Sequence, residues 1–80
     1  MVGQFFLTFN EDGRVQWAGE VLAWGEDEEV YIVRLVNWFT GSMADERPVR
    51  VSEMQGWEFY GSEKEAQDAY ERLRQEGRAG

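Results

Sequence analysis

The chain of 80 residues contains no cysteine, no histidine and a single proline. Without cysteine it forms no disulfide and offers no thiolate as a nucleophile or as a zinc ligand. Without histidine it lacks the most common general base, the Ser-His-Asp triad and the usual transition-metal ligand. We therefore expect a protein that is not an enzyme and that uses no cofactor and no metal.

Positive charge is also scarce. Eight Lys and Arg face sixteen Asp and Glu, which gives a formal net charge of −8. A surface of this sign is repelled by nucleic-acid phosphates and by anionic lipid headgroups. The N-terminus shows no secretory signal, and no apolar run approaches the roughly 20 residues that span a bilayer. The expectation is a cytoplasmic protein that binds neither nucleic acid nor membrane.

Aromatic residues are abundant, with five Phe, three Tyr and four Trp, and 42% of the chain is hydrophobic. This composition excludes a disordered acidic tail. The length fits one domain, residues 1–80, with a small and dense core.

Short alternating apolar runs predict five strands, over residues 4–9, 14–24, 29–39, a short segment beginning near Val49, and 57–60. Residues 10–13 and 25–28 carry turn chemistry. Residues 40–47 are predicted to form the longest loop, because Pro48 cannot lie in a central strand. Gly19 predicts a bulge or sharp bend, at which a side chain would obstruct a neighbouring backbone.

The last segment has the period of a helix. Ser62 and Glu65 match a capping box, in which both side chains bond free backbone amides. The apolar positions that follow, Ala66, Ala69, Tyr70 and Leu73, have helical spacing, and Gly77 is a natural stop. We predict a helix over residues 63–76. Since closure removes unpaired strand edges, the predicted fold is mainly β: a five-stranded SH3-like barrel (4–60) with one C-terminal helix (62–76).

The segment from Trp17 to Trp24, followed by Tyr31-Ile32-Val33, resembles the Trp-x-Gly-x-hydrophobic…Tyr-x-Val pattern of small SH3-like barrels. Plasmid-borne type II dihydrofolate reductases, which are of similar length, show a comparable pattern. In those enzymes a Val-Gln-Ile-Tyr strand lines the pore of a tetramer. The corresponding position here reads Val49-Arg50-Val51-Ser52. The resemblance therefore implies a barrel and transfers no catalytic role.

The second and third predicted strands carry large apolar residues on both faces, and one small interior cannot hold both sets. With Trp17, Val21, Tyr31, Val33 and Leu35 inward, a second set points outward; the reversed register exposes the other set instead. The helix could cover the outward set, or the set could form an interface with a protein partner or a second copy. The candidate partner-binding residues are Leu22, Trp24, Ile32, Val36 and Trp38, with the acidic turn of Glu26, Asp27 and Glu28.

Three other hypotheses concern the acidic and aromatic residues of the chain. The acidic run 26–29 is either a solvated hairpin tip or an electrostatic partner surface. The aromatic rings could form a cage for a methylated cation. The sixteen carboxylates could mimic nucleic acid, as in small phage and plasmid proteins that inhibit or regulate a host protein. Our primary hypothesis is a non-catalytic interaction module, and the alternative is the acidic mimic.

Overall fold

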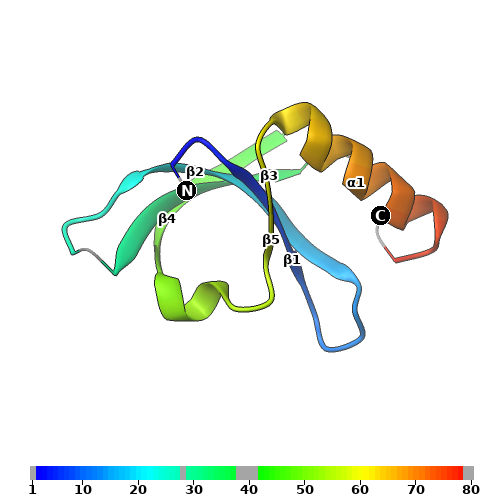
Figure 1. Cartoon of the computed structure of the whole chain (residues 1–80), viewed down its shortest axis with the longest axis horizontal. Coiled ribbons are helices and arrows are strands. Elements are labelled where there is room, and N and C mark those ends of the chain that lie inside the picture. The colour runs from blue at the N-terminus through cyan, green and yellow to red at the C-terminus, as the bar shows by residue number, and fades with distance from the viewer. Residues whose placement is uncertain (1, 28, 38–41, 79–80) are drawn as a thin grey trace.

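The structure is a computed structural model that describes residues 2–27, 29–37 and 42–78, with side chains over 2–27, 29–36 and 46–78. In chain order, the elements are β1 (Phe5–Phe9), β2 (Val15–Trp24), β3 (Val30–Asn37), β4 (Ser42–Arg50), the 3-10 helix η1 (Val51–Met54), β5 (Glu58–Tyr60) and α1 (Glu63–Gln75). Figure 1 shows their arrangement. The prediction of a mainly β fold with one C-terminal helix is confirmed.

The five strands form one antiparallel sheet in the order β4-β3-β2-β1-β5. The sheet is open: within the described residues β4 and β5 are its two edges and share no ladder. The predicted closure into a barrel is therefore not confirmed. The helix η1 joins the two edge strands on the opposite side of the sheet from α1 (Figure 1).

The prediction of a loop over residues 40–47 is wrong for 42–47, which belong to β4, and Thr40 and Gly41 lie outside the described residues. β4 pairs with β3 along its length, and Pro48 lies opposite Ile32. An edge strand tolerates proline because only one of its sides needs ladder hydrogen bonds. The strand predicted from Val49 ends at Arg50, after which Val51–Met54 form η1.

One core cluster fills the concave side of the sheet. Phe6, Val21 and Val33 are fully buried there, and Tyr31 and Met54 are buried with them. Trp57 stacks on Phe6 with ring centroids 4.6 Å apart, and it closes this cluster from the β5 side. The predicted inward positions Val21, Tyr31 and Val33 are confirmed.

Gly19 allows Phe6 to enter this cluster. A Cβ atom on Gly19 would lie 2.3 Å from the Arg34 carbonyl oxygen and 2.6 Å from Phe6 Cζ. The predicted close approach of a neighbouring backbone is confirmed. The irregularity in the β2–β3 ladder lies farther along, between Val21 and Ala23.

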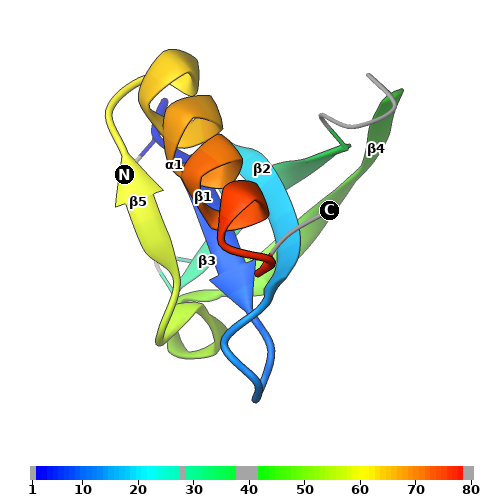
Figure 2. The ribbon, with the colours of Figure 1, turned by 90° about the vertical axis from the view of Figure 1, so that its right-hand side faces the viewer.

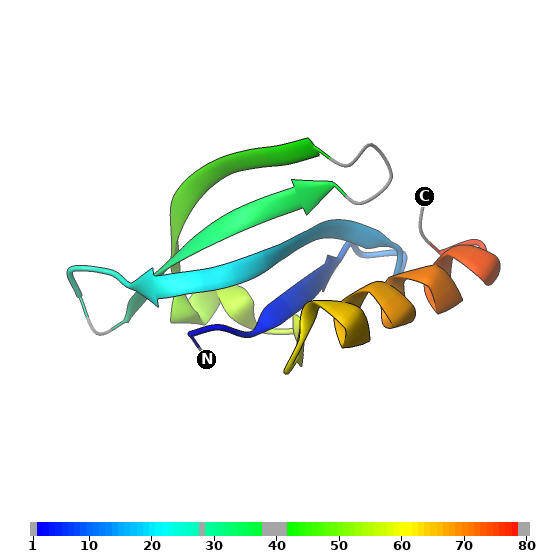
Figure 3. The ribbon, with the colours of Figure 1, turned by 90° about the horizontal axis from the view of Figure 1, so that it is seen from above.

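The second core cluster lies between α1 and the other side of β1 and β2. Leu7, Ala18 and Ala69 are buried in it, with Phe9, Tyr60 and Leu73 packed around them. Figures 2 and 3 show α1 over β1, between β5 and β2, whereas β3 and β4 extend away from the helix. The helix therefore covers only the part of the sheet's outer face that β5, β1 and β2 form.

The helix begins where the sequence predicts it. Ser62 is the N-cap, and its hydroxyl accepts a hydrogen bond from the Glu65 amide at 3.2 Å. The Glu65 carboxylate accepts from the amide of Gly61, one residue before the cap, rather than from the Ser62 amide expected of a capping box. The chain leaves the helix at Gly77, whose φ is +79°.

The residues after α1 hold the β1–β2 turn. The Arg78 guanidinium donates two hydrogen bonds to the Gly13 carbonyl, at 3.0 and 2.8 Å, and the Arg78 carbonyl accepts from the Val15 amide. The Arg14 side chain donates to the Gly77 carbonyl at 3.0 Å. These contacts fix the end of the helix to the sheet.

Candidate interaction surface

A one-residue bulge decides which way Trp24 points. The β2–β3 ladder pairs Val21 with Val33, then Ala23 with Ile32 and Trp24 with Tyr31, so Leu22 is the extra residue. A bulge reverses the alternation of side chains beyond it. Trp24 therefore lies on the face of Val21 and Tyr31. The expectation that it shares a face with Ile32 and Val36 is wrong.

Trp24 forms the exposed end of the concave core. Its ring lies 4.6 Å from the Tyr31 ring, centroid to centroid, at an interplanar angle of 33°. Tyr31 is buried, whereas Trp24 is 62% exposed, which is the largest exposure among the large apolar residues described. Val49 completes this row of the sheet, because it pairs with Tyr31 from the other side. The Trp24 side chain is thus largely exposed to solvent while its ring packs against a buried ring.

The described residues of the turn beside Trp24 are acidic and hydrogen-bonded to one another. The Gly25 amide donates to the Val30 carbonyl at 2.8 Å, and the Asp27 carboxylate accepts from the Glu29 amide at 3.1 Å. The Val51 amide donates to the Glu29 carbonyl, so the start of η1 lies beside the turn. Val51 is itself 41% exposed. We call the exposed side chains at this end of the sheet the Trp24 surface: Trp24, Val51, Glu26, Asp27 and Glu29.

The other predicted interface residues that the structure describes do not join this surface. Ile32 and Val36 lie on the opposite face of β3 and are half-buried, and Leu22 occupies the bulge. Glu28 and Trp38 lie outside the described residues. Of the eight predicted partner-binding residues, the structure therefore brings together Trp24, Glu26 and Asp27.

Trp17 is an exposed aromatic residue that sequence reasoning placed in the core. It is 48% exposed near the start of β2, where its amide donates to the Thr8 hydroxyl at 3.0 Å. Trp17 has the inward parity, as predicted, but it lies at the end of the strand, beyond the core cluster. Val51 had no place in the predicted interface, since the sequence predicted a strand there.

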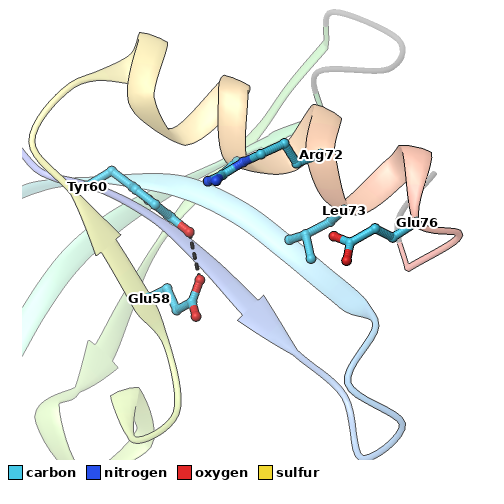
Figure 4. Close-up of a pocket in the computed structure, with 6 residues that line it drawn as sticks. Glu58, Tyr60, Arg72, Leu73 and Glu76 are labelled. Atoms are coloured by element: carbon cyan, nitrogen blue, oxygen red, sulfur yellow. Dashed lines mark hydrogen bonds between the residues drawn. The ribbon is translucent and has the colours of Figure 1, made fainter.

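A hollow lies between α1 and β5. It has a volume of about 220 Å³ and is lined by Glu58, Tyr60, Ala69, Arg72, Leu73 and Glu76 (Figure 4). The Tyr60 hydroxyl donates to the Glu58 carboxylate at 2.7 Å, and Arg72 extends from the helix toward Tyr60. Burial, followed by the bond to Glu58 and its charge, raises the pKa of Tyr60 to about 12, against a smaller opposing effect of Arg72. The phenol therefore keeps its proton near neutral pH.

The described residues contain no group of three acidic side chains arranged to hold a metal ion. Nor does any helix among them have the length and apolar character that crossing a membrane requires. A scan against protein-family models, a search of curated proteins and a search of solved structures each found no match. The resemblance to SH3-like barrels and to the reductases stays a prediction from sequence.

Proposed function

We propose that this chain is a non-catalytic protein-interaction module that uses the Trp24 surface to bind a protein partner or a second copy of itself. The observation that carries the proposal is the 62% exposure of a tryptophan whose base is fixed on the buried Tyr31 ring. Tryptophan is among the residues that contribute most to protein interfaces, and a preordered ring loses little conformational entropy on binding.

The layout around Trp24 supports the proposal. Interfaces typically have an apolar centre and a polar rim. Here Trp24 and Val51 are apolar and exposed, and Glu26, Asp27 and Glu29 of the adjoining turn are exposed as well. We propose further that the sheet is an incompletely closed SH3-like barrel. The strand order, the turn of η1 between the edge strands and the close contact at Gly19 support this assignment.

The test compares two exposed tryptophans on one strand. Wild type, Trp24→Ala and Trp17→Ala are immobilised, and proteins captured from a lysate of the native host are quantified in parallel. Sedimentation equilibrium of each variant measures self-association. We expect Trp24→Ala to weaken capture or association by about 2 kcal/mol, roughly thirtyfold. Trp17→Ala should leave it unchanged, and circular dichroism should show both variants folded.

Two results would contradict the proposal. If both variants bind as wild type does, the working surface lies elsewhere. If Trp24→Ala unfolds, the ring belongs to the core, and Trp24→Phe then decides whether association depends on the ring. If the Trp24→Ala variant binds as tightly as wild type and the affinity falls steeply with salt, the acidic mimic of nucleic acid is favoured.

A further inference from the structure

Most of the Trp24 residue is exposed to solvent. The centroid of the Trp24 ring lies 4.6 Å from that of the Tyr31 ring, and 62% of the residue is exposed. The face of an indole ring carries negative electrostatic potential and attracts cations, with tryptophan the strongest of the aromatic residues. The geometry therefore offers a flat, electron-rich platform on which a guanidinium or ammonium group can lie.

The carboxylates beside this platform are not neutralised. Among the described side chains, the ion pairs are Arg34–Glu46, Lys64–Asp68 and Arg74–Glu71, and none involves the acidic turn. Asp27 is bonded to a backbone amide, which leaves its charge in place. Two cations of β4 lie in this part of the sheet: Arg50, opposite Val30, has the parity of the other face, and Arg47, opposite Val33, has the parity of Trp24. The Trp24 surface is thus aromatic and negative.

A second copy of the chain fits this surface poorly. In a twofold symmetric dimer the same patch meets itself, so the acidic turns of both protomers would lie side by side. Each protomer also carries a net charge of −8. Like charges placed opposite one another disfavour association, whereas a basic segment is attracted by the same field.

We infer that the partner of the Trp24 surface is a basic protein segment, whose arginine or lysine side chain lies on the exposed ring of Trp24 and pairs with the carboxylates of Glu26 and Glu29. This inference rests on the proposed function and selects between its two kinds of partner. The aromatic platform supplies the contact, and the carboxylates supply the charge selectivity.

The experiment uses a fluorescein-labelled peptide of alternating arginine and glycine as the probe. Citrulline replaces each arginine in the control peptide, which keeps the shape of the side chain and removes its charge. Fluorescence anisotropy measures the affinity of the full chain for both. We expect the arginine peptide to bind at least about tenfold more tightly, and Trp24→Ala to reduce its affinity about tenfold. Trp24→Phe should retain most of the affinity because a ring face remains.

A charge-matched pair of variants separates the site from the overall field. Glu26→Gln with Glu29→Gln removes two charges beside Trp24, and Glu11→Gln with Asp12→Asn removes two from the β1–β2 turn. The two turns lie at opposite ends of β2 (Figure 1). We expect the first pair to weaken arginine-peptide binding about tenfold and the second pair to change it less than about twofold.

Equal binding of the two peptides, or an equal effect of the two charge pairs, would overturn the inference. Its failure is distinguishable from that of the proposed function. Suppose that Trp24→Ala loses the capture of a protein or the self-association, and that Trp17→Ala retains it. The Trp24 surface is then an interface, and only the inference that its partner is basic is wrong. If that difference between the tryptophans is also absent, the proposed function fails with it.

Discussion

Two single residues, Gly19 and Leu22, fix the positions of two aromatic pairs in the sheet. Gly19 leaves room for Phe6, which in turn stacks on Trp57 at 4.6 Å. The extra residue Leu22 reverses the alternation of β2, so that Trp24 lies on Tyr31. The close approach at Gly19 could be predicted from sequence because a glycine within a strand is conspicuous, whereas the contact with Phe6 was not predicted. The position of Trp24 could not be predicted: Val21, Leu22 and Ala23 are all apolar, so the alternation does not show which of them is the extra residue.

The contact at Gly19 predicts a large loss of stability in Gly19→Ala. The new methyl group would meet a backbone carbonyl oxygen at 2.3 Å and the Phe6 ring at 2.6 Å, so the sheet or the core must shift. We expect the free energy of unfolding in urea to fall by about 2–3 kcal/mol. Gly61→Ala is the control, because its nearest contact is the Glu65 carboxylate at 3.5 Å and it should change stability by less than about 1 kcal/mol. Equal effects of the two substitutions would contradict the close approach.

Tyr60 predicts a pH dependence at the alkaline end. The folded protein holds the phenolic proton of Tyr60 with a pKa of about 12, whereas the ordinary pKa of a tyrosine is 10.0. The stability linked to this proton is therefore complete below pH 10, and it is lost as the pH rises toward 12. The absorbance titration of wild type minus Tyr60→Phe, under conditions where circular dichroism shows a folded chain, should have its midpoint well above 10. Glu58→Gln should lower this midpoint, since it removes a negative charge beside the phenol. A midpoint near 10 in the wild-type difference would contradict the Tyr60–Glu58 contact.

At the scale of elements, α1 was the most predictable part of the chain, and β4 was the least. The helix carries its own start and stop signals in Ser62 and Gly77. β4 reads as a loop because it is polar and contains Pro48. It forms a strand because β3 offers it a free row of backbone donors and acceptors, which is a tertiary effect without a local signal. The position of η1 follows from the same partner, since the Val51 amide continues the bonding to Glu29.

The N-cap predicts a local effect of Ser62→Ala. The substitution removes the oxygen that accepts the Glu65 amide at 3.2 Å. We expect a loss of about 1 kcal/mol in the free energy of unfolding and faster amide exchange in the first turn of α1. Ser62→Asp should restore most of the loss, because aspartate caps helices and its charge suits the positive end of the helix dipole. If the alanine variant is as stable as wild type, the cap contributes nothing and the helix is held by its packing alone.

At the scale of the molecule, the two ends of the sheet differ. One end joins the β1–β2 turn to the residues after α1 through Arg78 and Arg14. The other end carries the Trp24 surface beside the acidic turn and η1. The sequence predicted an exposed aromatic surface next to an acidic turn, because the apolar residues exceed what one small interior can hold. It did not predict that Trp24 would lie on the face of Val21 and Tyr31, since this depends on the bulge.

The most direct test of the central claim, that the Trp24 end is the binding surface, is a nitrogen-15 NMR titration of the full chain with the arginine-glycine peptide. Tryptophan-to-phenylalanine variants assign the indole resonances of Trp17, Trp24 and Trp57. The account predicts the largest shift at the Trp24 indole, with further changes at the amides of Glu26, Glu29 and Val51. Trp57 is stacked on Phe6, and Trp17 lies near the far end of β2, so both should move little. Largest shifts at Trp17, or around the Tyr60 and Arg72 hollow, would contradict the account.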